Sequence, residues 1–243
     1  MDTKLKIWLQ INEETGAYFD DFCAISELGA RQWGIPFETF NNAHQIPLEP
    51  HNIVIGSVES CESFLVNMGL EIPAPIDMLK LEPVSGRSFK VEHKDDFLEY
   101  YEMYPYFIKP YDNHKAFLAF AAKDKGDVLM YTNDFDGNFL ISDVLDIIAE
   151  YRFYINKGKL IGAKHYLGDF LFFPDPEFIK KAVNFSTNIL PHLSYSLDFG
   201  VLKTGETVLI EAQDGWAIGN YGLEPYDYLK FVKDRWLQIT GIL

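Results

Sequence analysis

Four charged residues lie within segments whose apolar composition is otherwise typical of buried β-strands. They are Lys109 in YFIKP, Arg152 in EYRFYI, Asp198 in YSLDFGV and Glu211 in VLIEAQ. A buried charge is unfavourable unless a partner or a ligand compensates it. Two cations and two anions in one part of a chain therefore predict a site for an anionic ligand together with a metal ion.

The two acidic residues belong to neighbouring segments that a hairpin turn joins. The turn sequence is Thr204-Gly205, so Asp198 and Glu211 are expected at the same end of a strand pair. Gln213 lies two residues beyond Glu211 and faces the same side of its strand. Carboxylate and amide oxygens are ligands that Mg²⁺ prefers. We therefore predict Asp198, Glu211 and Gln213 as metal ligands; the alternative is that they occupy a solvent-facing end of the hairpin.

Composition and charge exclude several classes of function. The chain has 243 residues, 48% of them hydrophobic, which is enough for a packed core. No apolar run approaches the roughly 20 residues that span a bilayer, and the start MDTKLKIWLQ lacks a signal-peptide pattern. We therefore expect a cytoplasmic protein without a membrane partner. The net charge of −15 argues against a nucleic-acid partner.

Common catalytic motifs are absent from the sequence. It contains no GxxxxGK[ST], GxGxxG, GxSxG or HExxH pattern. The histidines are scattered without ligand spacing, and Cys23 and Cys61 have no metal-binding or redox spacing. Both cysteines are expected to be buried thiols.

The first part of the chain alternates between strand-like and helix-like segments, which predicts a small α/β lobe over residues 1–82. The proline-rich segment EIPAPID at 71–77 is typical of a linker. The expected strands are 4–11, 36–40 and 52–57, and the expected helices are 20–33 and 58–68.

Residues 83–243 are richer in strands and hairpins, which predicts an α+β fold. Asn156-Lys157-Gly158 is a hairpin turn by composition, and Asp175 followed by Pro176 is typical of a helix start. The expected strands are 87–91, 106–110, 127–132, 138–147, 150–155, 159–167, 195–203 and 206–213, and the expected helices are 94–103, 176–190 and one that begins at Pro225.

These segments resemble the ATP-grasp enzymes, from about Arg87 to Trp236. The resemblance implies the ATP-grasp fold, in which two α+β lobes clasp a nucleotide between antiparallel sheets. It places the ATP-grasp domain at 83–243, with a lid lobe at about 83–137 and a C-terminal lobe at about 138–243. The α/β lobe at 1–82 would precede this domain.

The resemblance also implies roles for particular residues. Lys109 in FIKP is similar to the family's phosphate-binding lysine, and Glu150 is placed like the glutamate that holds the ribose hydroxyls. Asp198 together with Glu211-Ala212-Gln213 resembles the family's metal ligands, an Asp followed by E-x-N, although a glutamine replaces the asparagine. The segment that resembles the adenine-binding hinge consists of Ile141, Ser142, Asp143 and Val144.

The sequence is most similar to the ATP-grasp clade named for one arginine and two lysines. Arg152 would be the arginine, and Lys109 and Lys115 the lysines. Arg152 would then contact the γ-phosphate or an acyl phosphate, and Lys115 would lie in the lid; the alternative for Arg152 is an ion pair with Glu150. After Lys115 the chain reads AFLAFAA, where family members commonly have a glycine, and Ala119 stands in that loop.

The resemblance implies a ligase that uses ATP and Mg²⁺ to convert a carboxylate into an acyl phosphate, which an amine then attacks. The acid and the amine, whether small molecules, peptides or proteins, carry no signature in the sequence. The alternative is a non-catalytic ATP-binding assembly factor, as in the clade's eukaryotic translation-initiation member. Its partner face would be the aromatic C-terminal region with Trp216, Tyr221, Tyr226 and Tyr228.

Overall fold

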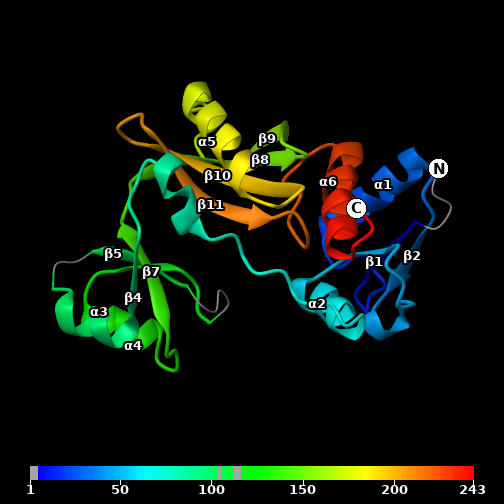
Figure 1. Cartoon of the computed structure of the whole chain (residues 1–243), viewed down its shortest axis with the longest axis horizontal. Coiled ribbons are helices and arrows are strands. Elements are labelled where there is room, and N and C mark those ends of the chain that lie inside the picture. Colours follow the sequence, from blue (N-terminus) through cyan, green and yellow to red (C-terminus); the bar gives the residue numbers. More distant parts are fainter. Residues whose placement is uncertain (1–4, 103–104, 112–115) are drawn as a thin grey trace.

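Three β-sheets with their helices make up the protein, lying side by side along its longest axis (Figure 1). This computed structural model describes residues 5–102, 105–111 and 116–243. The strand orders are β2-β1-β3 in a parallel sheet, β11-β10-β8-β9 in an antiparallel sheet and β4-β7-β5-β6 in a second antiparallel sheet. We call these the N-terminal, central and lid sheets. The predicted α+β architecture is confirmed.

In the N-terminal sheet, helix α1 connects the parallel strands β1 and β2, as is usual for such a crossover. Its core contains both cysteines, Cys23 and Cys61, which are free and buried as predicted. The C-terminal helix α6 packs against α1 and contributes Trp236 to the same core. The elements are β1 (Lys6–Gln10), α1 (Asp21–Trp33), β2 (Phe37–Phe40), the 3-10 helix η1 (Ala43–Gln45), β3 (Asn52–Ile55), α2 (Val58–Asn67) and α6 (Pro225–Ile239).

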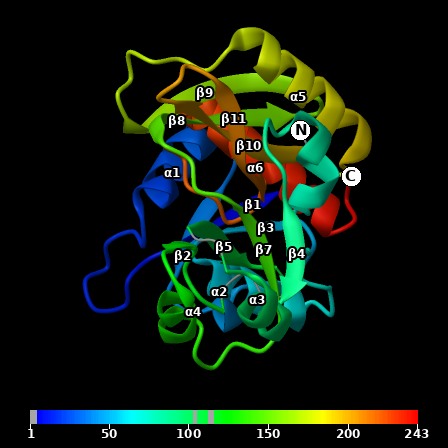
Figure 2. The same cartoon turned by 90° about the vertical axis from the view of Figure 1, so that its left-hand side faces the viewer.

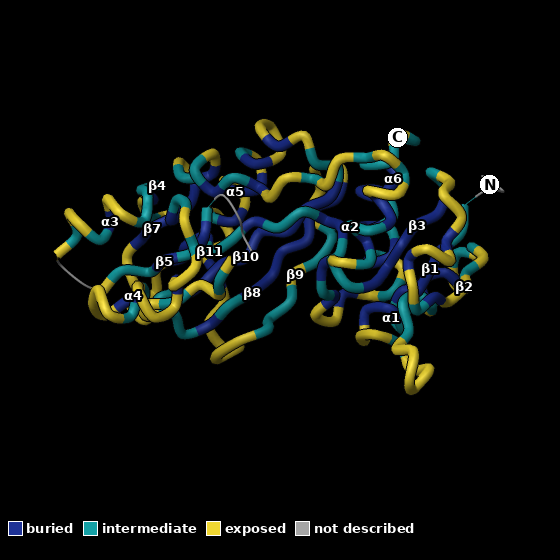
Figure 3. Tube along the Cα trace, turned by 90° about the horizontal axis from the view of Figure 1, so that it is seen from below, coloured by how far each residue is buried: buried dark blue, intermediate teal, exposed yellow. Residues whose placement is uncertain are grey.

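The central sheet is covered on one face by helix α5, while the lid lies toward its other face (Figure 2). The turn between β8 and β9 is the predicted one, and Lys157 and Gly158 both have positive φ, 49° and 71°, as a tight hairpin turn requires. Strands β8 and β10 of this sheet are among the most buried parts of the chain, whereas the edge strand β9 is not (Figure 3). The elements are β8 (Ile147–Asn156), β9 (Lys159–Gly168), α5 (Pro176–Ile189), β10 (Ser194–Leu202) and β11 (Thr207–Asp214).

The lid sheet has a small core of its own, in which Phe97, Ile108 and Phe139 are fully buried. Helices α3 and α4 complete this core on the side of the sheet that faces away from the central sheet. A 3-10 helix, η2 (Met78–Val84), leads into the lid. The elements are β4 (Lys90–His93), α3 (Lys94–Tyr100), β5 (Tyr106–Pro110), β6 (Phe120–Ala122), α4 (Lys125–Tyr131) and β7 (Asn138–Asp143).

One predicted strand is wrong. Residues 127–132 lie in and just after helix α4, because Asp124 caps a helix there by accepting a hydrogen bond from the backbone N–H of Asp127. Val128 is the only residue of this helix that is buried, so the segment packs through one side of a short helix. The fourth strand of the lid is β6, which the sequence analysis did not anticipate.

Two other strand boundaries differ from the prediction. The apolar run 138–147 is divided, since β7 ends at Asp143 and β8 begins at Ile147. Strand β4 begins at Lys90 rather than at residue 87. Because β7 pairs with β4 and β5, we propose that the lid extends to Asp143 instead of ending at about 137. The boundary near residue 82 stays a prediction, and helix α6 shares the core of the first lobe.

Among the described residues, no helix combines the length and the apolar character needed to cross a membrane.

Candidate site between the lid and the central sheet

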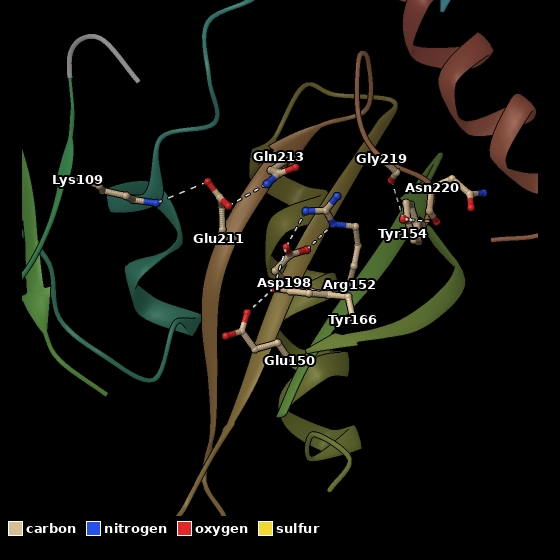
Figure 4. Close-up of polar contacts among 10 residues, drawn as sticks. All are labelled: Lys109, Glu150, Arg152, Tyr154, Tyr166, Asp198, Glu211, Gln213, Gly219 and Asn220. Atoms are coloured by element: carbon tan, nitrogen blue, oxygen red, sulfur yellow. Dashed lines mark hydrogen bonds and ion pairs between the residues drawn. The ribbon is translucent and has the colours of Figure 1, made fainter. Parts of the chain in front are cut away.

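The polar residues predicted for the site share one face of the central sheet. Alternate side chains of a strand point to opposite faces; Tyr151 and Phe153 belong to the core under α5, so Glu150 and Arg152 lie on the opposite face. The register places Asp198 beside Arg152 on one side and beside Glu211 on the other. Figure 4 shows these side chains together with Gln213 on the same side of the sheet.

Arg152 and Asp198 form a buried bidentate ion pair. Arg152 Nε donates to Oδ1 and Nη2 to Oδ2 of Asp198, each at 2.8 Å, and their side chains are only 4% and 3% exposed. Burial alone would lower the pKa of Arg152, but the two hydrogen bonds from Arg152 to Asp198 outweigh it and raise that pKa. Burial raises the pKa of Asp198, and the guanidinium opposes that change. Asp198 is thus the partner of Arg152, not the Glu150 that the sequence offered.

Two tyrosines cover this ion pair. The Tyr221 ring lies 4.5 Å from the guanidinium of Arg152 and stacks on the Tyr166 ring at 5.0 Å. The Tyr166 hydroxyl donates to Glu150 at 2.7 Å and also contacts Asp198 at 3.3 Å. Burial is the main reason that the pKa of Tyr166 is raised. Glu150 is therefore linked to the ion pair through the Tyr166 hydroxyl (Figure 4).

Lys109 reaches from the lid sheet to the central sheet. Its Nζ lies 3.8 Å from Glu211 Oε1, and Gln213 Nε2 donates to the other Glu211 oxygen at 2.9 Å (Figure 4). Burial lowers the pKa of Lys109, and the carboxylate of Glu211 opposes this shift. The structure thus brings Lys109 next to Glu211 and Gln213, from which it is far apart in the sequence.

Arg87 is a residue of this site that the sequence analysis missed. It donates from Nε to the carbonyl of Leu209 at 3.1 Å, from Nη2 to that of Ile210 at 2.8 Å, and from Nη1 to Ser142 Oγ at 3.3 Å. Burial lowers the pKa of Arg87 to about 10, and the nearby carboxylate of Glu211 opposes the shift. An arginine that stands before a strand carries no sign in the sequence that it will be partly buried.

The predicted hinge segment is divided between two environments. Ile141 belongs to the core of the lid, whereas Ser142 is buried next to Arg87. Asp143 and Val144 are exposed. Lys115, predicted for the lid, lies outside the described residues.

The predicted metal ligands fit a magnesium ion in their chemistry. Glu211 and Gln213 supply carboxylate and amide oxygens on one face of β11. Both oxygens of Asp198 accept from Arg152, yet a carboxylate has about four lone-pair positions, so it can also ligate an ion. No cluster of three or more His, Cys, Asp or Glu side chains suited to a metal is present in the described part of the chain. Glu211 and Gln213 are the principal candidates for metal ligands, because both oxygens of Asp198 already accept hydrogen bonds from Arg152.

The geometry defines a protein that can hold an anionic ligand between two antiparallel sheets, with cations from the lid and carboxylates from the central sheet. The chain belongs to the ATP-grasp domain proteins, in family 2 of the clade named for one arginine and two lysines. The model of that family matches residues 86–231 and so more than half of the 243 residues. The sequence-based assignment to this clade is confirmed. A comparison with curated proteins finds no match.

Solved structures share the fold at low sequence identity. The D-alanine–D-alanine ligase from Bacillus anthracis complexed with ATP has a TM-score of 0.53 and 12% identity, with 98% of each chain covered. A RimK domain ATP-grasp protein from Sphaerobacter thermophilus has a TM-score of 0.60 and 11% identity over 96% of this chain and 99% of that one. An L-amino acid ligase from Bacillus licheniformis has 0.58 and 12%, over 97% and 76%. These likenesses confirm the ATP-grasp fold.

Proposed function

We propose that this protein binds ATP with Mg²⁺ between the lid and the central sheet and uses it to join a carboxylate to an amine. The observation that carries the proposal is the approach of Lys109, from the lid, to within 3.8 Å of Glu211, on the central sheet. A partly buried lysine, with a side chain that is 16% exposed, beside a carboxylate that can hold a metal suits a metal-bound polyphosphate. Membership of the ATP-grasp family supports the same ligand.

Each residue of the site has a role in this proposal. Lys109 contacts the phosphates, and Glu211 and Gln213, completed by Asp198, would hold the magnesium ion. Bound magnesium supplies charge neutralisation at the phosphate oxygens. Glu150 accepts hydrogen bonds from the ribose hydroxyls. In this role the Glu150 carboxylate accepts from the ribose as well as from the Tyr166 hydroxyl. The remaining predicted contacts are the backbone of the hinge, Ile141, Ser142, Asp143 and Val144, and the lid lysine Lys115.

The reaction would follow in two steps. An oxygen of the acid attacks the γ-phosphorus, the bond to ADP breaks, and an acyl phosphate forms. The amine nitrogen then attacks the acyl carbon, inorganic phosphate leaves and a proton is released. The protein's part is to position these groups and to balance their charge.

Arg152 takes a different part from the one first expected. Since its Nε and Nη2 donate to Asp198 and its side chain is only 4% exposed, we propose that it is a positioning residue. It fixes the Asp198 carboxylate beside Glu211 and balances its charge in the buried strand.

The test is release of ADP when Mg-ATP is offered with panels of carboxylic acids and amines. ADP release that requires an acid and falls at least about 100-fold in Lys109→Ala would support the ligase. Lys90→Ala is the matched control, because Lys90 is an exposed lysine on β4, a lid strand that β7 separates from β5, and its loss should leave the rate unchanged.

Binding of ATP without ADP release would instead favour the assembly-factor alternative. Of the aromatic residues proposed as its partner face, Trp216 and Tyr228 are buried in the core. Tyr221 and Tyr226 are about half exposed, 48% and 50%, but each packs on another ring. Because of these contacts, little aromatic surface is left for a protein partner, and we therefore favour the ligase over the assembly factor.

A further inference from the structure

A cavity of about 410 Å³ adjoins Lys109 and Glu211. It lies where the lid and the central sheet meet the segment that leaves the first lobe, and its volume is within the range of small-molecule sites. Its lining is mostly apolar: residues 73–76 and Met78 form one wall, and Trp216, Ala217 and Ile218, after β11, contribute to another.

Two carboxylates of this lining already have hydrogen-bond partners within the protein. Asp77 accepts from the backbone of Leu79 at 3.0 Å and so caps η2. Asp214 is held by a bidentate pair from Arg235, with N–O distances of 2.5 and 2.6 Å. Both carboxylates are thereby committed to the fold. The polar groups of the lining next to the proposed phosphate site are Lys109, Glu211 and Gln213.

The lining also carries more negative than positive charge. Among the described residues that line the cavity, Lys109 is the only lysine or arginine, whereas Asp77, Glu211 and Asp214 are all acidic. A single carboxylate placed beside Lys109 would have a cationic partner. A second carboxylate at the other end of the same ligand would lie against apolar walls, and the described lining has no further lysine or arginine to compensate its loss of hydration.

We propose that this cavity holds the acid substrate, and that this substrate is a monocarboxylic acid with an apolar body. The carboxylate lies toward Lys109 and the body lies between segment 73–78 and Trp216. Acids with a second anionic group, such as dicarboxylates and phosphorylated acids, are rejected by the same lining. That the bound acid is a substrate rests on the proposed function. Binding of the acid to the cavity can be measured without turnover.

The first test compares hexanoate with adipate, which share a chain length and differ by a second carboxylate. Saturation-transfer NMR and calorimetry on the full chain, with and without a non-hydrolysable Mg-ATP analogue, should show hexanoate bound at least about tenfold more tightly. Leucine and glutamate form a second pair with the same expected order. Equal binding of the two acids, or preference for adipate, would overturn the inference.

A charge introduced at the cavity tests whether this lining sets the preference. Ala74 is an exposed residue that lines the cavity, so Ala74→Lys adds a cation there without burying it in the core. It should reduce the preference for hexanoate at least about threefold. Ala17→Lys adds the same charge at an exposed position outside the lining and should leave the preference unchanged. If Ala74→Lys leaves the preference for hexanoate over adipate unchanged, the cavity lining does not set that preference, which would contradict the inference.

The two proposals fail differently. If the Mg-ATP analogue binds but none of the four acids does, the cavity assignment is wrong and the nucleotide site stands. If hexanoate binds selectively and the analogue does not, the cavity assignment stands and the proposed use of ATP is wrong.

Discussion

The buried ion pair between Arg152 and Asp198 shows how closely the site residues depend on one another. Removing two charges from water is costly, and their attraction offsets that cost only when the geometry is good and the remaining polar atoms are satisfied. Here two hydrogen bonds of 2.8 Å join the side chains, and the Tyr166 hydroxyl contacts the same carboxylate. The pair should therefore matter most when only one partner is lost.

We predict that Arg152→Met lowers the free energy of unfolding by about 3–5 kcal/mol, because it leaves the Asp198 carboxylate buried without its partner. The double variant Arg152→Met/Asp198→Leu should lose less than the sum of the two single changes. Urea denaturation of the three variants measures this coupling. Arg31→Met is the control, since Arg31 is 62% exposed in its pair with Glu27 and should cost about 1 kcal/mol at most. Strictly additive losses would show that the pair is not coupled.

The residue scale also shows what a sequence can reveal about a site. Charges within apolar strands identified Lys109, Arg152, Asp198 and Glu211, and the structure places all four at the junction of the lid and the central sheet. The partner of Arg152 could not be predicted, because the sequence does not give the register that sets Asp198 of β10 beside Arg152 of β8.

At the scale of elements, patterns with caps and turns were the most predictable. Helix α5 begins at Pro176 with Asp175 as its cap, and the β8–β9 hairpin turns at Lys157-Gly158, both as expected. Segment 127–132 failed because its composition favours a strand, whereas the cap at Asp124 and the packing of Val128 favour a helix. A short apolar segment does not distinguish the two by periodicity.

Helix α6 carries a buried carboxylate that links it to the central sheet. Asp234 is 1% exposed and accepts from Lys230, Lys233 and Asn156. Burial alone would raise the pKa of Asp234, but hydrogen bonds from Lys233 and Lys230 outweigh it and hold that pKa well below its ordinary value. A carboxyl whose folded pKa is depressed contributes stability above its unfolded pKa, and this contribution is lost as the pH falls toward the folded value.

We therefore predict that wild-type protein loses more stability than Asp234→Asn between about pH 4 and pH 2. The difference should approach about 1.4 kcal/mol per pH unit, which corresponds to one additional proton taken up on unfolding. Urea denaturation at several pH values in this window measures it. Asp227→Asn, at a half-buried position in the first turn of the same helix, serves as control and should follow the wild type. Parallel pH profiles for wild type and Asp234→Asn would contradict the assignment.

At the scale of the whole molecule, two sheets from different parts of the chain must approach each other before the site exists. Arg87 helps to fix that approach, because it bonds to β7 of the lid and to β11 of the central sheet. Most of the strands and most of the charged residues could be predicted from the sequence. The contact of Lys109 with Glu211 and the hydrogen bonds of Arg87 could not be predicted, since both depend on how the lid packs against the central sheet.

The central claim is that the lid and the central sheet hold Mg-ATP together, through Lys109 on one and Glu211 on the other. The most direct measurement is calorimetric titration of Mg-ATP into the wild type, Lys109→Ala and Glu211→Gln. Their matched controls are Lys90→Ala on the lid and Glu206→Gln, which changes an exposed glutamate in the turn between β10 and β11. The account predicts saturable binding in the wild type and both controls, with at least about tenfold weaker binding in Lys109→Ala and Glu211→Gln, or about 1.4 kcal/mol. Wild-type protein that binds no Mg-ATP, or both site variants binding it as tightly as the controls do, would contradict the account.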